Sequence, residues 1–377
     1  MKQAFRFLAA AVVLMLLCSL TAHAVDVNEI YSDVADRFGV SELIDAAPDA
    51  ARGSLSGEQV SPSGLLNLLS MNNVLNLLTN GLFGVLGECL SGCAVLLVAV
   101  LVFLLLAGLR DSFHSSAIVP TFNLVAVLTI SLVVYGIISG AYSAAFTATK
   151  DITAFISTLM PVMAATMAAG GEVVSVGILP PAILTAINLL SWLNTSVFLP
   201  TLNFYFALSF ISAVNPRLNL KELMNFIKKA LMWGMGIATT ILVGLLSLQK
   251  MITGASDNIT GRAAKFALSS FVPIIGGVLK DAFDTVAGCV SVIKATCGVF
   301  GIVVIIYTML PILARVILYN VGFRLSSSVA QISGQSSVSN FLDSVSNIWS
   351  ILTAILVSEG VFAIVSVAVV ISTGGGT

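Results

Sequence analysis

Long apolar runs separated by short polar segments fill the chain from residue 89 onwards. An α-helix needs about 20 apolar residues to cross the hydrocarbon core of a bilayer, and most of the runs reach that length. The pattern predicts eight candidate spans, at 89–109, 118–146, 152–169, 176–193, 196–214, 230–249, 296–319 and 346–372. Pro161, Pro180 and Pro181 interrupt the third and fourth spans, so the expected number is six to eight. The fold class expected is all-α, a polytopic bundle of transmembrane helices occupying residues 89–372.

The N-terminal residues have the pattern of a secretory signal peptide. Lys2 and Arg6 precede an apolar run at 7–20, which is followed by the small residues around Ala24. We expect residues 1–24 to be this signal, cleaved after Ala24, and the alternative is an uncleaved anchor helix. Either interpretation sends the chain from residue 25 across the membrane.

Residues 25–88 form an acidic segment that we place outside the cytoplasm. Its first part, 25–63, holds eight of the 18 acidic residues of the chain but too few apolar residues for a core of its own. We expect it to fold on a partner or on the membrane face. From residue 65 to 82, polar residues recur every three or four positions among leucines, at Asn67, Ser70, Asn73, Asn76 and Asn80. This spacing predicts an amphipathic helix that lies in the interface or packs on a neighbouring subunit.

Basic residues in short loops predict the orientation, because they gather on the cytoplasmic side. With residues 25–88 outside, Arg110 lies inside after the first span. The densest basic loop also lies inside, after five spans: Arg217, Lys221, Lys228 and Lys229. Arg315 and Arg324 also lie on the cytoplasmic side, but only if residues 266–294 do not cross the membrane. Three basic residues fall outside in this arrangement, against the rule: Lys250, Arg262 and Lys265.

The segment 266–294 is predicted to be a broken re-entrant or interfacial hairpin. Three residues that disfavour a continuous helix interrupt its apolar run: Pro273, Gly276 and Gly277. Three charged residues follow the break: Lys280, Asp281 and Asp284. Non-helical backbone at membrane depth must be buried in protein or line water. The hairpin and these charged residues are therefore candidates for a pore-facing element, and the alternative is a purely structural hairpin.

Glu359 lies close to the centre of the last predicted span. A carboxyl group at that depth costs about 2.5–3.5 kcal/mol on insertion scales, so we expect it to face the bundle or water and to be paired or protonated. Its candidate partners are Lys280, Lys294 and Arg315. The alternative is a carboxyl group satisfied by serine hydroxyls and backbone groups where two helices meet. Three asparagines are expected to form hydrogen bonds across helices: Asn188, Asn194 and Asn203.

Composition narrows the function classes. Hydrophobic residues make up 58% of the chain and charged residues 9%, whereas soluble domains carry about 25% charged residues. A net charge of −1 gives no basic surface for nucleic acid. After signal cleavage His114 is the only histidine, and no phosphate-binding loop of the G-x-x-x-x-G-K-[ST] type occurs. We therefore expect no enzyme, cofactor or metal site, although Cys89 and Cys93, one helical turn apart, leave a metal as a minor alternative to ordinary packing.

Several segments together resemble the stage III sporulation protein AE family of endospore-forming bacteria. They are LPTLNFY at 199–205, IKKA at 227–230 with Trp233, GLLSLQ at 244–249, AAKFA at 263–267, FVPIIGG at 271–277, DAFDT at 281–285 and GC at 288–289. The resemblance covers residues 190–372 well, and the N-terminal third only in its layout.

The resemblance implies a polytopic subunit of the SpoIIIA–SpoIIQ complex, a channel that is similar in parts to secretion machines. It would lie in the outer forespore membrane, which derives from the mother cell, with ring-forming subunits and a separate cytoplasmic ATPase as partners. The implied role is in forespore development, and homo-oligomers are possible in such an assembly. No residue role can be transferred from the family.

Three functions follow from these patterns. The first is a non-enzymatic subunit of a channel or export platform. The second is a self-contained secondary transporter, although the two halves of the chain show no internal repeat. The third is a membrane scaffold that only collects other subunits. The C-terminal residues 373–377, with three consecutive glycines, are expected to be a flexible tail.

Overall fold

The computed structural model describes residues 37–40, 42–49, 51–52, 71–111, 118–215, 218, 220–271, 276–332 and 334–373. Within the helices it does not describe the side chains of residues 71–83, 109–111, 118–120, 261–262, 264–271 and 276–285. The described chain consists of helices and turns with no strand, which confirms the all-α prediction.

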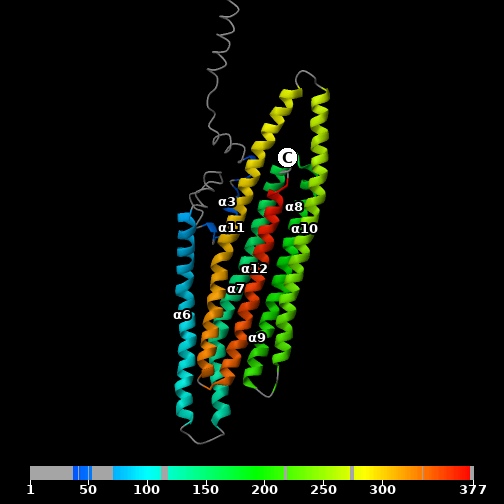
Figure 1. Ribbon diagram of the computed structural model, residues 1–377. Coiled ribbons are helices and arrows are strands. Elements are labelled where there is room, and N and C mark those ends of the chain that lie inside the picture. Colours follow the sequence, from blue (N-terminus) through cyan, green and yellow to red (C-terminus); the bar gives the residue numbers. More distant parts are fainter. Residues whose placement is uncertain are drawn as a thin grey trace, which may run out of the picture.

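Long helices run up and down along one common direction as an elongated bundle (Figure 1). The elements are α3 (Glu42–Asp45), α6 (Met71–Asp111), α7 (Ile118–Ala169), α8 (Val173–Leu193), the π-helical turn η1 (Asn194–Phe198), α9 (Leu199–Val214), α10 (Lys221–Phe271), α11 (Gly276–Ile332) and α12 (Ser336–Ile371). Six stretches of the described chain are long and apolar enough to cross a membrane, at the lower limit of the predicted range. The molecule is a polytopic helical bundle.

The structure has six candidate spans rather than eight because two pairs of predicted spans each form one continuous rod. The predicted spans 118–146 and 152–169 are one helix, α7, because Lys150 and Asp151 between them do not stop the backbone hydrogen bonds. The side chain of Lys150 lies over the ring of Phe146, 4.3 Å from its centroid. Pro161 also lies inside α7 without ending it. A polar pair alone therefore does not end a helix.

The second join links α8 to α9 through the π-helical turn η1. Pro180 and Pro181, which seemed to interrupt a span, both lie inside α8. Pro200 lies at the start of α9, where a missing backbone N–H removes one hydrogen bond and favours the wider π geometry just before it. Residues 173–214 therefore form one rod with a local widening at Asn194.

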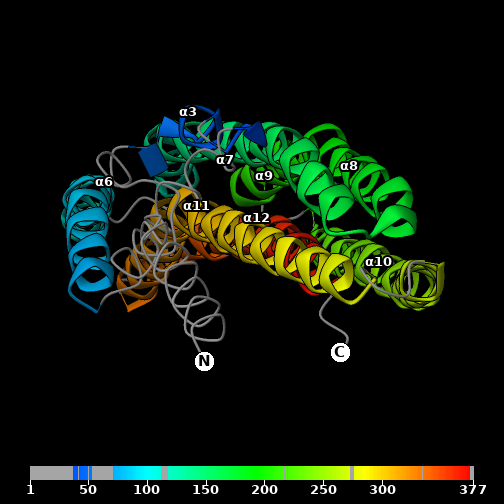
Figure 2. The ribbon, with the colours of Figure 1, turned by 90° about the horizontal axis from the view of Figure 1, so that it is seen from above.

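The helix α12 is the central element of the bundle. It packs against α7, α8, α9, α10 and α11, as the view along the bundle shows (Figure 2). Trp349 of α12 stacks on Tyr319 of α11 with ring centroids 5.1 Å apart, and Phe323, one turn further along α11, lies at 5.4 Å from it in a tilted arrangement. Because lipid tails are as apolar as these side chains, close packing rather than removal from water holds such helices together.

Glycines of α11 allow the closest helix contacts. A Cβ atom at Gly301 would lie 2.6 Å from Leu159 of α7, a distance that real contacts do not reach. Cβ atoms at Gly298 and Gly322 would likewise overlap Ile371 and Cys93. The small residues therefore set how near α11 approaches α6, α7 and α12, as is common between membrane helices.

The predicted hairpin 266–294 falls only partly on described residues. Of the residues that form its predicted break, Gly276 and Gly277 are the first residues of α11, and Pro273 lies outside the described residues, after the end of α10 at Phe271. The flanking residues are continuous parts of helices of 51 and 57 residues rather than a short separate element. At 1.5 Å per residue α11 is about 85 Å long. The re-entrant or interfacial interpretation of 266–294 therefore stays a prediction.

Part of the acidic segment packs on the bundle itself. Val40, Leu43, Ala47 and Ala51 are buried, and the short helix α3 contacts α7. The segment was expected to fold on a partner or on the membrane face, but the apolar surface of α7 supplies the missing core for its described residues.

Candidate functional site

Glu359 is fully buried inside the bundle, on α12. Its carboxylate oxygen Oε2 accepts a hydrogen bond of 2.5 Å from the side-chain amide of Asn194, which is also fully buried. Thr153 of α7 adds a second side-chain contact to the carboxyl group. Three helical segments that are far apart in the sequence therefore meet at this carboxyl group.

The contacts along α12 place Glu359 near the middle of a membrane-sized band. Lys228 of α10 donates a 2.7 Å hydrogen bond to Asn347, and Lys250 of α10 donates a 2.6 Å bond to Ser372. Between these lysines α10 has the charge-free stretch 230–249, which is about 30 Å long. Glu359 lies about 18 Å along α12 from Asn347 and about 20 Å from Ser372. That Glu359 lies at the centre of a membrane span stays a prediction.

Three buried oxygen atoms around this point have no hydrogen-bond partner among the described residues. They are Oε1 of Glu359, Oδ1 of Asn194 and Oγ1 of Thr149. A buried oxygen without a partner costs about 1–3 kcal/mol, so such groups are rare unless they serve a function or hold a water or an ion. The π-helical turn that begins at Asn194 is a type of helix defect often found at functional sites.

Two of the three cations proposed as partners of Glu359 bind elsewhere. Lys294 forms a buried ion pair with Glu172, and Arg315 forms a 2.6 Å ion pair with Glu88 at the surface of α6. The side chain of the third candidate, Lys280, lies outside the described residues. An amide instead of a cation contacts Glu359, so the expectation of a hydrogen bond across helices is confirmed for Asn194.

A second polar layer lies near the upper end of the bundle in Figure 1. Lys294 of α11 bonds to Glu172 and to the backbone oxygen of Thr373, and the Thr373 hydroxyl donates a 2.6 Å bond to Glu172. Asp257 of α10 accepts bonds of 2.7 and 3.0 Å from the backbone N–H groups of Val174 and Ser175, the first turn of α8. These contacts close the end of the bundle and hold Thr373 in place, although residues 373–377 were expected to be a flexible tail.

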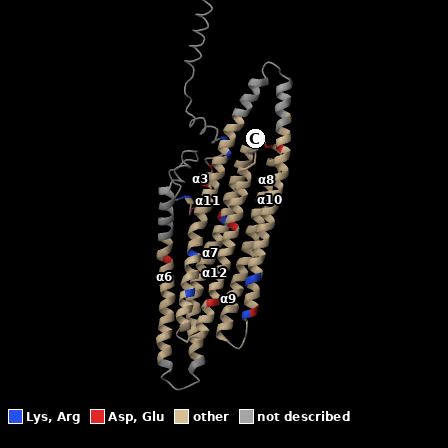
Figure 3. Cartoon of the chain, in the orientation of Figure 1, with Lys and Arg blue, Asp and Glu red and all other residues tan. Residues whose placement is uncertain are grey.

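A third polar layer lies at the opposite end of α12. The amide of Asn347, which accepts from Lys228, also donates a 3.3 Å bond to the hydroxyl of Tyr205 in α9. Below it a cleft of about 560 Å³ opens between α9, α10, α11 and α12, lined by serines, asparagines and charged residues. The described helices carry few charges overall, and Figure 3 shows a group of them at this end of α10.

Packed apolar side chains separate the lower layer from Glu359. Between Asn347 and Glu359 the buried residues of α12 are Ile348, Trp349, Ile351, Leu352, Ile355 and Leu356. The two polar layers therefore lie at separate levels of α12, with these buried apolar side chains between them.

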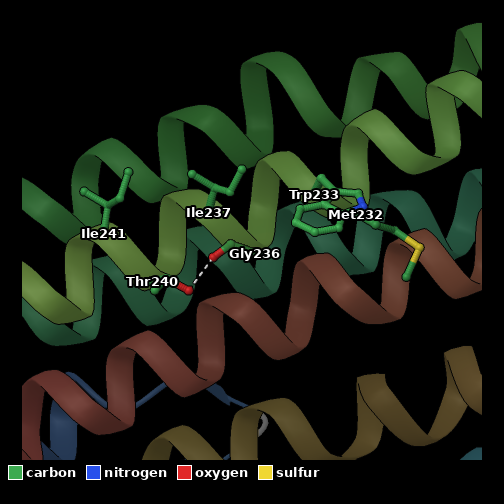
Figure 4. A pocket seen from close by; sticks show the side chains of 6 residues that line it. All are labelled: Met232, Trp233, Gly236, Ile237, Thr240 and Ile241. Carbon is green, nitrogen blue, oxygen red and sulfur yellow. Dashed lines mark hydrogen bonds between the residues drawn. The ribbon is translucent and has the colours of Figure 1, made fainter.

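The outer face of α10 carries a shallow apolar groove of about 390 Å³ (Figure 4). Trp233 and Ile237 line it and are 72% and 52% exposed. The one hydroxyl in it, of Thr240, donates to the backbone oxygen of Gly236 and is thereby satisfied within the helix. A groove of this kind fits lipid chains or an apolar helix and offers no group for chemistry.

The layers of polar contacts and six membrane-length helices fit the outcome of comparisons with known proteins. The family described as stage III sporulation protein AE matches residues 63–374. This chain belongs to the stage III sporulation protein AE family. It is 25% identical over 357 residues to stage III sporulation protein AE of Bacillus subtilis (strain 168), covering 92% of this chain and 85% of the relative. No solved structure matches the chain.

For several predicted site residues of this family member, the structure describes the helix that carries them but not their side chains. Lys280, Asp281 and Asp284 lie on α11, and Gly276 and Gly277 are its first residues, but their side chains are outside the described set. Pro273 and Arg217 lie outside the described residues altogether. The remaining basic-loop residues, Lys221, Lys228 and Lys229, lie in the first turns of α10. Their suggested role at a pore therefore stays a prediction.

Sequence reasoning missed the contacts of Asn347, Tyr205 and Glu172 in this family member. Glu172 follows two glycines, and this sequence is typical of a loop. Only the fold shows that Glu172 forms a buried ion pair with Lys294. Among the described residues no group of three or more His, Cys, Asp or Glu side chains comes together. Cys89 and Cys93 are both buried free thiols, and the Cys89 thiol lies 3.8 Å from the backbone oxygen of Arg315.

Proposed function

We propose that this protein is a non-enzymatic membrane subunit of a secretion-like channel complex that joins the mother cell to the forespore and is required for forespore development. Membership of a sporulation family and the six membrane-length helices support the setting. The observation that carries the proposal is Glu359, a carboxyl group held at mid-membrane depth by Asn194 and left with one oxygen unpartnered. Carboxyl groups at such depth are costly and mark ion or substrate pathways or proton relays.

The proposed orientation places the start of α10 in the mother-cell cytoplasm. Lys221, Lys228 and Lys229 lie there, and Arg324 of α11 lies at the same end, which agrees with the bias of basic residues toward the cytoplasm. The opposite end, with the acidic segment and Thr373, then faces the space between the two membranes. Ring-forming subunits would bind there and a separate ATPase would bind at the cytoplasmic end. Further copies of this chain are also candidate partners.

The test replaces Glu359 and follows forespore gene expression and spore yield in sporulating cells. Glu359→Ala removes the acceptor and leaves the buried Asn194 amide unpaired, at a cost of about 1–3 kcal/mol. Glu359→Gln keeps the size and a hydrogen bond to Asn194 but cannot release a proton. We expect both variants to remain in the membrane and to block forespore gene expression.

Thr240→Ala serves as the matched control, since its hydroxyl bonds only within α10 on the outer face. It should leave expression and spore yield unchanged. Wild-type spore yield from both Glu359 variants, at wild-type protein level, would remove Glu359 from the proposed function.

A self-contained secondary transporter is the second candidate, favoured by the same buried carboxyl group beside the helix defect at Asn194. The two proposals differ in what the chain does alone. Proton-coupled uptake into liposomes that contain only the purified chain, abolished by Glu359→Gln, would favour the transporter. Activity only in the presence of the other subunits would favour the channel complex.

A further inference from the structure

The cleft at the basic end of the bundle is a cavity that the proposed channel activity does not use. Its volume of about 560 Å³ falls in the range of small-ligand sites. Four helices line it, with Tyr205 and Asn347 among its lining residues and the exposed residues Lys221 and Asn340 giving it access to solvent.

Two cations line the cleft without a described acidic partner. Lys221 forms no ion pair with a described residue, and the Nε of Arg324 donates a 2.9 Å bond to the neutral Asn320. The single lining carboxylate, Asp343, accepts a 2.8 Å hydrogen bond from Ser327. Lys228, whose Nζ bonds to the lining residue Asn347, adds a third positive charge next to the cleft. The local charge is therefore positive.

The rest of the lining supplies neutral hydrogen-bond donors. Hydroxyl and amide groups come from Ser209, Ser212, Ser336, Ser337, Asn225 and Asn340. Ser336 and Ser337 also form the first turn of α12, where free backbone N–H groups and the helix dipole favour an anion. Cations, hydroxyls and free N–H groups around one cavity are the set of groups that binds phosphate oxygens.

The height of the cleft matches the headgroup layer of a bilayer. The charge-free stretch of α10 begins at residue 230, and the lining residues Lys221 and Asn225 lie about 8 to 14 Å beyond it along the helix. The headgroup regions begin at the edge of the hydrocarbon core, and basic pockets between helices on the cytoplasmic side bind anionic headgroups.

We propose that this cleft binds the phosphate group of an anionic ligand, through Lys221 of α10, Arg324 of α11 and the first turn of α12. The geometry favours an anionic phospholipid of the cytoplasmic leaflet as the source of the phosphate. A free phosphate-bearing molecule presents the same chemistry, and the experiment separates the two. The proposal stands independently of any pore function, because it concerns binding alone.

The experiment measures lipid binding to the purified full chain by native mass spectrometry, with phosphatidylglycerol as the probe and phosphatidylcholine as the neutral comparison. Lys221→Gln and Arg324→Gln should each weaken phosphatidylglycerol binding about tenfold, the effect of losing one charge-assisted contact. Lys221→Arg and Arg324→Lys, which keep the charge, should restore most of the binding. Inorganic phosphate is added in a parallel series as a competitor.

The matched control is the double variant Lys150→Gln/Lys229→Gln. It removes the same net charge as the double variant Lys221→Gln/Arg324→Gln, from an exposed position of α7 and a neighbouring exposed position of α10 that does not line the cleft. We expect the control to bind phosphatidylglycerol as the wild type does. Gel-filtration profiles of all variants confirm that each is folded.

Loss of phosphatidylglycerol binding in the cleft variants, with no competition by inorganic phosphate, supports the lipid as the source. Displacement of the lipid by inorganic phosphate at a similar concentration supports a phosphate site that serves a soluble ligand. Equal binding by the cleft and control double variants, or equal binding of phosphatidylcholine and phosphatidylglycerol by the wild type, would overturn the proposal.

Discussion

At the scale of single residues, two buried polar clusters differ in how many of their polar atoms have a hydrogen-bond partner: one beyond the C-terminal end of α12 and one around Glu359. Lys294 and Glu172 pair with each other and share Thr373, so each charged group has a partner. Glu359 and Asn194 share one hydrogen bond, and each keeps an oxygen without a partner. The first cluster has the properties of a structural clamp and the second those of a site that takes up a proton, a water or an ion.

If Lys294 and Glu172 form a structural clamp, loss of one partner should destabilise the protein more than loss of both. Lys294→Met leaves the Glu172 carboxylate buried without its partner, which should destabilise the protein by about 3–5 kcal/mol and lower its melting temperature in detergent. The double variant Glu172→Leu/Lys294→Met removes both charges and should recover much of that loss. A melting temperature of Lys294→Met equal to that of the wild type, measured with a thiol-reactive dye, would show that the pair is not a clamp.

At the scale of helices, the structure shows what the sequence pattern could and could not predict. Apolar run length predicted the helical class, which the described helices confirm. The pattern failed at Lys150, Pro161 and Pro180, because a helix surrounded by other helices tolerates charge pairs and prolines that would end it in water. For Glu359 the sequence suggested basic partners or uncharged groups where helices meet, and the described partner is the amide of Asn194, at the start of the widened turn.

The continuity of α7 can be measured directly. Spin labels at Thr121 and Ala168, which are both exposed, should lie about 70 Å apart if residues 118–169 form one straight helix. Two antiparallel spans joined near Lys150 would bring the labels within about half that distance. Double electron–electron resonance on the doubly labelled chain distinguishes the two, and a short distance would restore the eight-span arrangement.

At the scale of the whole molecule, the charge-free stretches of different helices lie at different heights. The pair Glu88–Arg315 places the stretch 89–109 of α6 beside the lower part of α11. The bond from Lys250 to Ser372 places the stretch 230–249 of α10 beside the upper part of α12. A flat bilayer can cover both stretches only if it crosses the bundle obliquely, and tilts of this kind are common among membrane helices.

We propose that the buried polar level around Glu359 becomes part of a water-filled path when the partners of the proposed complex bind. In the isolated chain that level is closed by apolar side chains such as Leu352 and Leu356. A channel subunit must therefore change the surroundings of this level when its partners bind, whereas a scaffold need not.

The most direct test is cysteine accessibility at Thr153, beside the Glu359 carboxyl group, in a cysteine-free background. Asn340→Cys in the exposed cleft is the reactive control, and Thr240→Cys on the apolar face of α10 is the unreactive one. The account predicts that Thr153→Cys is protected from a charged thiol reagent in the purified chain and is labelled in sporulating cells that contain the whole complex. Protection of Thr153→Cys in both settings, with labelling of Asn340→Cys, would contradict a path through this level and favour a scaffold.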